Sequence, residues 1–133
     1  MPDYSNKKTK PLVSIIMNCH NGEKFVSQSL KSIKLQTYGN WELIFWDNKS
    51  TDNSEKIIKN YSDKRIRFFK SKKFLNLYSA RNLAVKKARG KYISFLDVDD
   101  LWKKDKLQKQ VSFLKQNKDF KIVYSNFITL DEI

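Results

Sequence analysis

Short apolar runs alternate along this chain with segments in which apolar residues recur every three or four positions. The runs are rich in β-branched and aromatic side chains, which is typical of strands, and lie at residues 12–17, 41–46, 66–69 and 91–96. The periodic segments have the spacing of amphipathic helices and lie at about 23–36, 53–61, 79–89 and 103–116. Strands that alternate with helices favour βαβ units. We therefore predict an α/β fold, an α/β/α sandwich with a mainly parallel central sheet.

Local signals suggest where these helices begin and which side chains they bury. Residues 50–52, Ser-Thr-Asp, are predicted to cap the second helix. In the third helix, Ala80, Leu83, Ala84 and Ala88 are predicted to face inward, with Gly90 just past the end. A further extended apolar run is expected at 121–130.

The length of 133 residues suits one domain. Residues 1–10 are polar and lysine-containing, and we expect them to form a flexible basic tail. They lack the apolar stretch of a signal peptide, and no apolar run in the chain reaches the roughly 20 residues of a membrane-spanning helix. The expected location is cytoplasmic, with the possibility of peripheral contact at the inner face of the membrane.

The charge balance is strongly basic, with 27 Lys and Arg residues against 14 Asp and Glu residues and a net charge of +13. Such a balance favours anionic partners, which include nucleic acid, acidic lipid head groups and phosphorylated small molecules. A lysine-rich surface that serves only solubility is the alternative. Cys19 is the single cysteine, so no internal disulfide is possible.

Polar residues follow three of the predicted strands, at 18–21, 47–48 and 97–100. In an open α/β sheet, ligands bind outside the carboxyl ends of the strands. The three groups are therefore predicted to meet at one rim and to form a binding site there.

The third group contains the sequence Asp97-Val98-Asp99-Asp100. In an extended strand, Asp97 and Asp99 would point the same way. Together they could hold a hard divalent cation such as Mg²⁺ or Mn²⁺, which prefers oxygen ligands and would attract a diphosphate. The alternative is a turn in which Asp97 or Asp100 caps the following helix.

The sequence is compatible with several roles for His20: a metal ligand, a general base, a flat surface for a nucleobase, or an ordinary loop residue. The chain has no second histidine for a zinc site. It also has no nucleophile elbow, no P-loop and no G-x-G-x-x-G loop, which argues against hydrolase, P-loop and dinucleotide-binding sites.

Several motifs in order resemble the family-2 inverting glycosyltransferases, from about Pro11 to about Tyr124. The most specific pieces are Gln36-Thr37-Tyr38, Asp47 with Ser50-Thr51-Asp52, Ala80-Arg81-Asn82, and Phe95-Leu96-Asp97-Val98-Asp99-Asp100 followed by Trp102. The resemblance implies a GT-A (Rossmann-like) fold, a nucleoside-diphosphate-sugar donor with UDP-sugar favoured, and Mn²⁺ or Mg²⁺ as cofactor. It also implies a role in polysaccharide or cell-envelope biosynthesis.

The resemblance carries roles to particular residues. It implies that His20 stacks on the nucleobase and that Asp47 and Asn48 contact the base. Asp97 would lie near the ribose and the metal, and Asp99 would bind the metal. The full set implied to bind the nucleotide sugar is Asn18, His20, Asn21, Glu23, Asp47, Asn48, Arg81, Asp97 and Val98, with Asp97 and Asp99 as metal ligands. For Arg81, an intramolecular salt bridge is the alternative.

The chain departs from the family pattern after strand one, where Thr or Ser with Tyr-Asn is frequent and this chain has Asn18-Cys19-His20-Asn21. It also departs at two adjoining positions after strand two. Asn48 stands where a second aspartate is frequent, and Lys49 stands where a glycine is usual. An asparagine can still accept a hydrogen bond from a base N–H through its carbonyl oxygen. Because Asn48 lacks the charge of an aspartate, the resemblance leaves the choice of base open, and Lys49 is expected to alter the turn.

Complete family members continue into an acceptor-binding half that carries the catalytic base. Residues 11–133 are therefore expected to be a nucleotide-sugar-binding domain that lacks this half. We expect it to belong to a glycosyltransferase that acts with inversion on a glycan or lipid-linked acceptor, with the general base outside this chain. One alternative is a truncated, non-catalytic nucleotide-binding remnant. Another is a basic nucleic-acid-binding module built on aromatics near lysines, although Phe68 and Phe69 fit a strand core more simply and no specific nucleic acid is expected.

Overall fold

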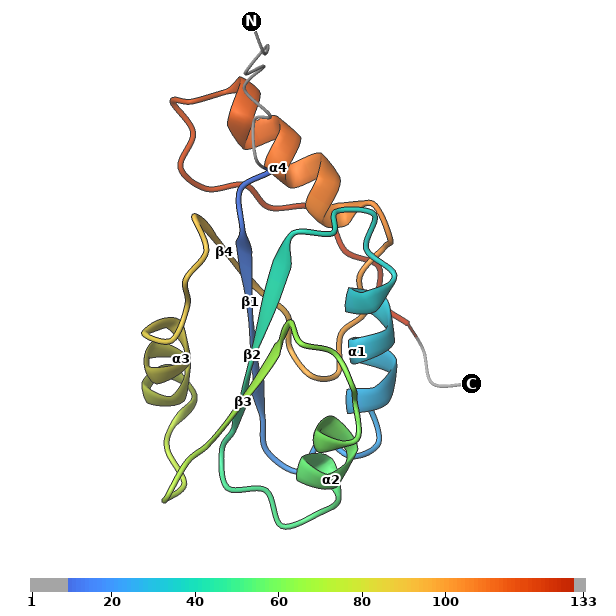
Figure 1. Ribbon diagram of the computed structural model, residues 1–133, viewed down its shortest axis with the longest axis vertical. Coiled ribbons are helices and arrows are strands. Elements are labelled where there is room, and N and C mark those ends of the chain that lie inside the picture. Colours follow the sequence, from blue (N-terminus) through green and yellow to red (C-terminus); the bar gives the residue numbers. More distant parts are fainter. Residues whose placement is uncertain (1–9, 131–133) are drawn as a thin grey trace, which may run out of the picture.

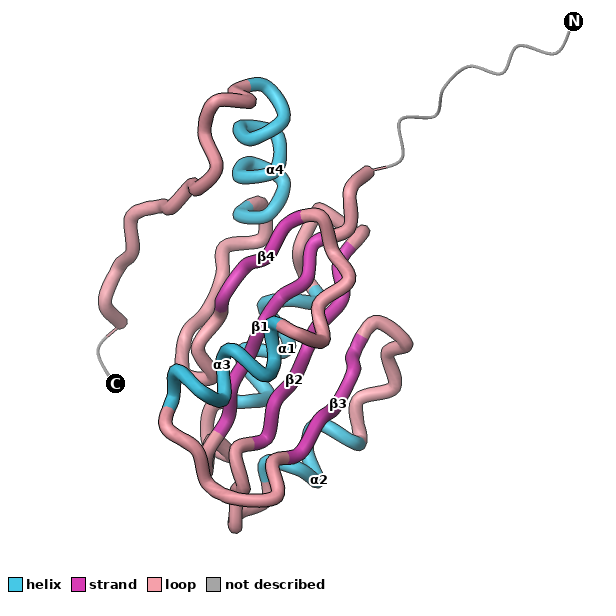
Figure 2. Tube along the Cα trace, turned by 90° about the vertical axis from the view of Figure 1, so that its left-hand side faces the viewer, coloured by secondary structure: helices cyan, strands magenta, loops and turns pink. Residues whose placement is uncertain are grey.

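The computed structural model describes residues 10–130, and they form a four-stranded sheet covered by helices (Figure 1). The strands are all parallel and stand in the order β3-β2-β1-β4 (Figure 2), as predicted for βαβ units. In chain order the elements are β1 (Val13–Cys19), α1 (Val26–Lys34), β2 (Trp41–Asp47), α2 (Ser54–Lys59), β3 (Ile66–Lys70), α3 (Leu77–Val85), β4 (Tyr92–Phe95) and α4 (Lys106–Gln116).

The register of the sheet brings the ends of its strands together. Cys19, the last residue of β1, lies opposite Asp47, the last residue of β2, and Asp47 lies opposite Lys70 of β3. On the other side of β1, Ile16 lies opposite Phe95 of β4. The carboxyl ends of β1, β2 and β3 therefore form one rim, and β4 ends three residues short of the last pair between β1 and β2.

Alternate side chains of the central strands enter two cores, because successive residues in a strand point to opposite faces. One face of the sheet packs on α1 and α2, and the other packs on α3 (Figure 1). The first core includes Ile15, Met17, Leu43, Phe45, Val26, Leu30, Ile33 and Ile58, and the second is built from Ile16, Ile44, Trp46, Ala80 and Ala84. β1 and β2 are thus covered on both faces, which explains their nearly continuous apolar sequences.

A polar cluster joins three strands at the other end of the sheet. The carboxylate of Glu42 accepts hydrogen bonds from the Ser14 hydroxyl at 2.6 Å, the Arg89 backbone N–H at 2.7 Å and the Arg67 guanidinium at 3.0 Å. Burial alone would raise the pKa of Glu42, but these hydrogen bonds and the charge of Arg67 lower it. Gly90 lies against Ser14, since a Cβ at position 90 would stand 2.6 Å from the Ser14 nitrogen.

Three helices begin or end away from their predicted positions. α1 begins at Val26 after a turn, and α4 begins at Lys106 rather than near 103. α3 covers 77–85 instead of 79–89, because the Asn76 side chain accepts the Ser79 backbone N–H and caps an earlier start. The prediction for Leu83 was wrong: its side chain is 37% exposed, whereas Ala80 and Ala84 are fully buried.

The C-terminal apolar run forms no strand within the residues described. Residues 121–130 are irregular, and most of their apolar side chains face solvent, including Ile122, Tyr124 and Phe127. The predicted basic tail falls almost wholly on residues 1–9, outside the described part. Among the helices that the structure describes, none is long and apolar enough to cross a bilayer.

Candidate functional site

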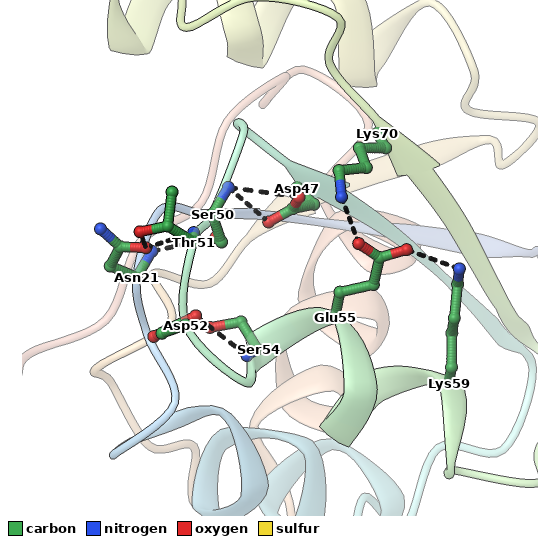
Figure 3. A network of polar contacts seen from close by, with 9 residues as sticks. All are labelled: Asn21, Asp47, Ser50, Thr51, Asp52, Ser54, Glu55, Lys59 and Lys70. Atoms are coloured by element: carbon green, nitrogen blue, oxygen red, sulfur yellow. Dashed lines mark hydrogen bonds and ion pairs between the residues drawn. The ribbon is translucent and has the colours of Figure 1, made fainter.

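The loops that follow β1 and β2 interlock at the rim of the sheet (Figure 3). The Asn21 side-chain oxygen accepts the Thr51 backbone N–H at 2.8 Å, and the Asn21 N–H donates to the Ser50 hydroxyl at 3.0 Å. One residue further on, the Gly22 N–H donates to the Ser54 hydroxyl at 2.9 Å. These hydrogen bonds join segments about 30 residues apart in sequence and give the rim a defined shape.

Asp52 and Glu23 add further hydrogen bonds between the two loops, one from each loop. Asp52 accepts the backbone N–H of Glu23 at 3.0 Å and that of Ser54 at 2.9 Å. Although burial alone would raise the pKa of Asp52, hydrogen bonds to Ser54 and Glu23 lower it. In return, the Glu23 carboxylate accepts two hydrogen bonds from Asn53, at 2.8 and 2.9 Å. The prediction that residues 50–52 provide the N-cap of the second helix was wrong. α2 starts at Ser54, and its N-cap residue is Asn53, whose side chain makes no capping hydrogen bond.

Asp47 lies fully buried beneath these loops. Each of its carboxylate oxygens lies 3.3 Å from the Ser50 backbone nitrogen, so the charge faces the turn that follows β2. Beside it, Glu55 pairs with Lys59 at 2.6 Å and with Lys70 (Figure 3). The carboxylate of Asp47 thus stabilises the loop at the rim.

Asn48 uses both ends of its side-chain amide to hold Leu75. Its Nδ2 donates to the Leu75 carbonyl oxygen at 2.8 Å, and its Oδ1 accepts the Leu75 backbone N–H at 3.1 Å. The residue is 6% exposed. The amide fixes the 71–77 loop to the rim, a connection that the sequence did not reveal.

Lys49, in the turn that follows β2, has a backbone conformation that favours glycine. Its φ angle is 61°, in the left-handed region that residues with a side chain rarely adopt. Asn21 has a φ of 52°, and asparagine tolerates this region better than most residues. A glycine adopts this conformation freely, so the lysine carries strain that the usual glycine would not. That Lys49 alters the turn stays a prediction.

A shallow pocket of about 170 Å³ opens between the end of β1 and the 74–80 segment. The exposed His20 ring lines it and meets the ring of Phe74 edge-on, with 4.7 Å between centroids. His20 Nδ1 lies 3.0 Å from the Asn48 carbonyl oxygen, and Nε2 lies 3.4 Å from Asn21 Nδ2. A proton on Nδ1 satisfies both contacts, with Nδ1 donating and Nε2 accepting, and we assign that tautomer.

Asn18 lines the same pocket with an unpaired amide. Neither its Oδ1 nor its Nδ2 has a hydrogen-bond partner in the described part of the chain, although both atoms are buried. Buried polar atoms without a partner are uncommon in folded proteins, and each one calls for an explanation. An amide offers one donor and one acceptor side by side, which is the pattern needed to pair with the edge of a nucleobase.

The acidic residues after β4 form a turn. β4 ends at Phe95, and the Asp100 N–H donates to the Asp97 carbonyl oxygen at 3.0 Å. The premise that Asp97 and Asp99 project from one extended strand was wrong. The alternative of a turn is confirmed, but its capping role was wrong, since α4 begins only at Lys106. Burial first, and then the charges of Asp99 and Asp97, raise the pKa of the Asp100 carboxyl, so the three carboxylates are close enough to repel.

Arg81 of α3 reaches this turn from the other face of the sheet. Its Nη2 lies 2.6 Å from Asp97 Oδ1, and the Asp97 side chain is 56% exposed. The salt bridge that was an alternative role for Arg81 is therefore present. The turn also lies against the β1 loop, because a Cβ on Gly22 would stand 3.0 Å from a methyl carbon of Val98.

Polar side chains of α1 and of the residues just after it hold the acidic turn and the segment that follows. The Ser29 hydroxyl lies 2.5 Å from the Val98 carbonyl oxygen and 2.7 Å from that of Asp100. Two residues past the end of α1, Gln36 donates to the Lys103 carbonyl oxygen at 2.8 Å and accepts the Leu107 N–H at 3.1 Å. Residues 98–107 are thereby fixed along the helix, which explains why α4 starts later than predicted.

The acidic turn has the donor chemistry of a hard-cation site. Asp97 and Asp99 present exposed carboxylates, and Asp100 adds a third nearby. Oxygen ligands of this kind suit Mg²⁺ or Mn²⁺, which complete their shells with water and substrate phosphate. No group of three or more His, Cys, Asp or Glu side chains in residues 10–130 is arranged to hold an ion by itself. A cation held by these carboxylates would need further ligands, such as water or a substrate phosphate.

The predicted site residues separate into two groups. The first group lies at the rim: exposed His20 and the buried amide of Asn18 line the pocket, and Asp97, Asp99 and Arg81 lie at the acidic turn. The second group has its side chains committed to the loops: Asn21, Glu23, Asp47 and Asn48. Sequence reasoning missed the pocket residues Phe74, Leu75 and Leu77, and a lone aromatic in a lysine-rich loop was the only available signal.

Known structures share this fold. The crystal structure of S. aureus TarS residues 1–349 in complex with UDP superposes with a TM-score of 0.76 at 26% identity, covering 80% of this chain and 32% of that chain. The corresponding complex with UDP-GlcNAc gives a TM-score of 0.74 with the same identity and the same shares. The architecture is that of the GT-A glycosyltransferases, as predicted.

Sequence comparison gives the family. Residues 14–129 match the model of Glycosyl transferase family 2, and the chain belongs to that family. A UDP-Glc:alpha-D-GlcNAc-diphosphoundecaprenol beta-1,3-glucosyltransferase of Escherichia coli, WfgD, is 40% identical over 116 residues, which is 87% of this chain and 46% of that protein. An uncharacterized glycosyltransferase of Haemophilus influenzae is 45% identical over 109 residues, 80% of this chain and 44% of that protein. The chain thus spans less than half the length of these relatives.

Proposed function

We propose that this chain is the donor-binding portion of an inverting glycosyltransferase that uses a UDP-sugar and a divalent cation, Mn²⁺ or Mg²⁺. The observation that carries the proposal is the arrangement of the rim. An unpaired amide and an exposed aromatic ring line a pocket at the end of β1, and an acidic turn with an arginine lies beyond the end of β4. This is the order of groups that a base, a ribose and a diphosphate would meet.

The pocket is assigned to the base. The His20 ring is exposed and would stack on a pyrimidine, while the Asn18 amide would pair with the donor and acceptor groups on its edge. Asn21, Glu23, Asp47 and Asn48 support this pocket by fixing the two loops and the 71–77 segment. The proposal therefore gives them positioning roles in place of direct base contacts.

The acidic turn is assigned to the diphosphate. Asp97 and Asp99 would hold the cation, and a bound cation supplies charge neutralisation to a departing diphosphate. The Arg81 guanidinium, already at Asp97, adds a positive charge where phosphate oxygens would lie. Gln36 and Ser29 keep the turn in place, so the carboxylates need little rearrangement to act.

Sugar transfer itself is proposed for the whole protein. The acceptor would be a glycan or a lipid-linked sugar, by analogy with the undecaprenol-linked substrate in the name of the Escherichia coli relative. We propose that the general base lies outside this chain and that transfer inverts the anomeric configuration by a single displacement. The location proposed is the cytoplasmic face of the membrane, in contact with anionic lipid.

Calorimetry with UDP, GDP and dTDP, each with and without Mn²⁺, tests donor binding. We expect UDP to bind and Mn²⁺ to strengthen binding. Asp99→Asn should remove the Mn²⁺-dependent increment, and His20→Ala should weaken UDP binding with or without the metal. Asp105→Asn removes the same charge from an ion pair with Lys109 on α4 and should leave binding unchanged. The absence of binding to all three nucleotides would refute the proposal.

A further inference from the structure

A second hollow lies beside α1, away from the rim pocket. It has a volume of about 450 Å³ and runs between the C-terminal half of α1 and the segment 101–104, which leads from the acidic turn to α4. In Figure 1 this segment is part of the orange connection between β4 and α4. We call this hollow the α1 groove, and its lining includes Lys31, Leu35, Leu101, Trp102 and Lys104. None of these residues lines the rim pocket.

The α1 groove combines exposed apolar tips with free positive charges. Leu35 is 60% exposed and Leu101 is 46% exposed, although both are large apolar side chains. Lys31 and Lys104 make no ion pair with any of the residues described, and no acidic side chain lines the groove. Lysines carry apolar stems below their charged ends, so the groove presents an apolar floor with a cationic edge.

Trp102 adds a side chain suited to an interface between water and hydrocarbon. It is partly buried, and the Lys106 ammonium lies 4.2 Å from the centroid of its ring system. Tryptophan is favoured where one end of a side chain is apolar and the other is wet.

We propose that the α1 groove docks the protein on an anionic lipid bilayer. Leu35 and Leu101 enter the interfacial layer, and Lys31 and Lys104 pair with lipid phosphates. The positive charges of Lys31 and Lys104 favour an anionic bilayer, because cationic side chains at a membrane surface bind acidic lipid. The apolar side chains add affinity for lipid that a nucleic acid backbone cannot provide. The inference rests on the proposed function in one respect, since docking would bring the rim near a lipid-linked acceptor.

The hydrogen bonds of α1 give this docking a geometric effect. Ser29 of α1 and Gln36 just past its end hydrogen-bond to residues 98–107, so these contacts join the α1 groove to the acidic turn. A protein held on the bilayer through the groove would therefore hold Asp97 and Asp99 at a set distance from the lipid head groups.

The experiment combines vesicle co-sedimentation with tryptophan fluorescence. Vesicles of phosphatidylcholine alone are compared with vesicles that also contain phosphatidylglycerol. Trp41 and Trp46 are 2% and 7% exposed, so a blue shift on binding reports on Trp102, and Trp102→Phe should abolish it. We expect binding and a blue shift only with the anionic vesicles. Equal binding to both vesicle types, or no binding to either, would overturn the proposal.

Paired variants separate a defined surface from general attraction by net charge. The double variant Lys31→Ala, Lys104→Ala should bind anionic vesicles about 30-fold more weakly. The matched control Lys86→Ala, Lys87→Ala removes the same charge at the end of α3, on the opposite face of the sheet, and should change binding less than about 3-fold. Equal losses in the two double variants would refute the docking surface.

The apolar contribution and the proposed function are tested on the same proteins. Leu35→Ser with Leu101→Ser should reduce the blue shift and the bound fraction, with an unchanged thermal unfolding curve as the check on folding. A normal blue shift in this variant would contradict insertion. UDP calorimetry on each groove variant should match the parent chain. Vesicle binding without UDP binding in the parent chain would refute the proposed function alone.

Discussion

Replacement of Asn48 by aspartate distinguishes a structural role from direct contact with a base. In the structure, Asn48 Nδ2 donates to the Leu75 carbonyl oxygen at 2.8 Å, and Oδ1 accepts the Leu75 N–H at 3.1 Å. Asn48→Asp keeps the acceptor and turns the donor into a second oxygen. Two oxygens would then face each other in a site that is 6% exposed.

The size of the effect follows from this lost hydrogen bond. A buried acceptor that loses its donor costs about 1–3 kcal/mol. That range corresponds to about 5- to 150-fold in an equilibrium. A shift of this size toward an open 71–77 loop lowers the fraction of protein in which Phe74 lies beside His20. The apparent affinity for UDP then falls by up to the same factor.

Three measurements test the reasoning. UDP calorimetry should show weaker binding for Asn48→Asp, thermal unfolding should show a lower Tm, and the Leu75 amide should exchange its hydrogen faster. Asn60→Asp makes the same substitution at an exposed position that ends α2 and controls for the added charge. Tighter UDP binding with an unchanged Tm would refute the structural role and favour a carboxylate that reads the base.

Two other predictions concern the polar groups that hold the sheet and the acidic turn. Glu42→Gln should lower the free energy of unfolding by about 3 kcal/mol at neutral pH, because a buried ion pair loses one partner. The pKa of Glu42 is lowered from its ordinary 4.5, so its contribution is complete above that pH and is lost as pH falls through the folded-state pKa. Denaturant titrations should show the two proteins converging in acid, and a constant difference would contradict this. Gln36→Leu leaves the Lys103 carbonyl and the Leu107 N–H unpaired and should cost about 2–4 kcal/mol. It should also weaken Mn²⁺ binding, measured by electron paramagnetic resonance. Unchanged Mn²⁺ binding would contradict the role of Gln36 in holding the acidic turn.

Local pattern was sufficient for most of the sheet. β1 and β2 are covered on both faces, so their sequences are apolar at nearly every position and easily recognised. The helix starts were less accurate because polar contacts across the fold decide them. Residues 103–105 have helical periodicity, yet the Gln36 side chain and the Thr37 N–H hold that segment along α1.

The site shows the same division between local and long-range information. The rule that ligands bind at the carboxyl ends of parallel strands brought residues 18–21, 47–48 and 97–100 to the same side of the sheet. The partners of these residues could not be read from the sequence. Asn48 meets Leu75 across 27 positions, and Asn21 meets Thr51 across 30. Arg81 of α3 meets Asp97 in the turn after β4. The nucleotide-binding and metal-binding roles of these residues remain predictions.

The order of the strands bears on how the chain behaves by itself in solution. β4 pairs with β1 along one side only, and on its other side no strand in residues 10–130 accompanies it (Figure 2). Ile93 and Phe95 of this strand are 44% and 50% exposed. An edge strand with exposed apolar side chains can pair with a strand of a second polypeptide. We expect self-association to rise with protein concentration, so sedimentation velocity should accompany each binding titration. Ile93→Lys should reduce the self-association.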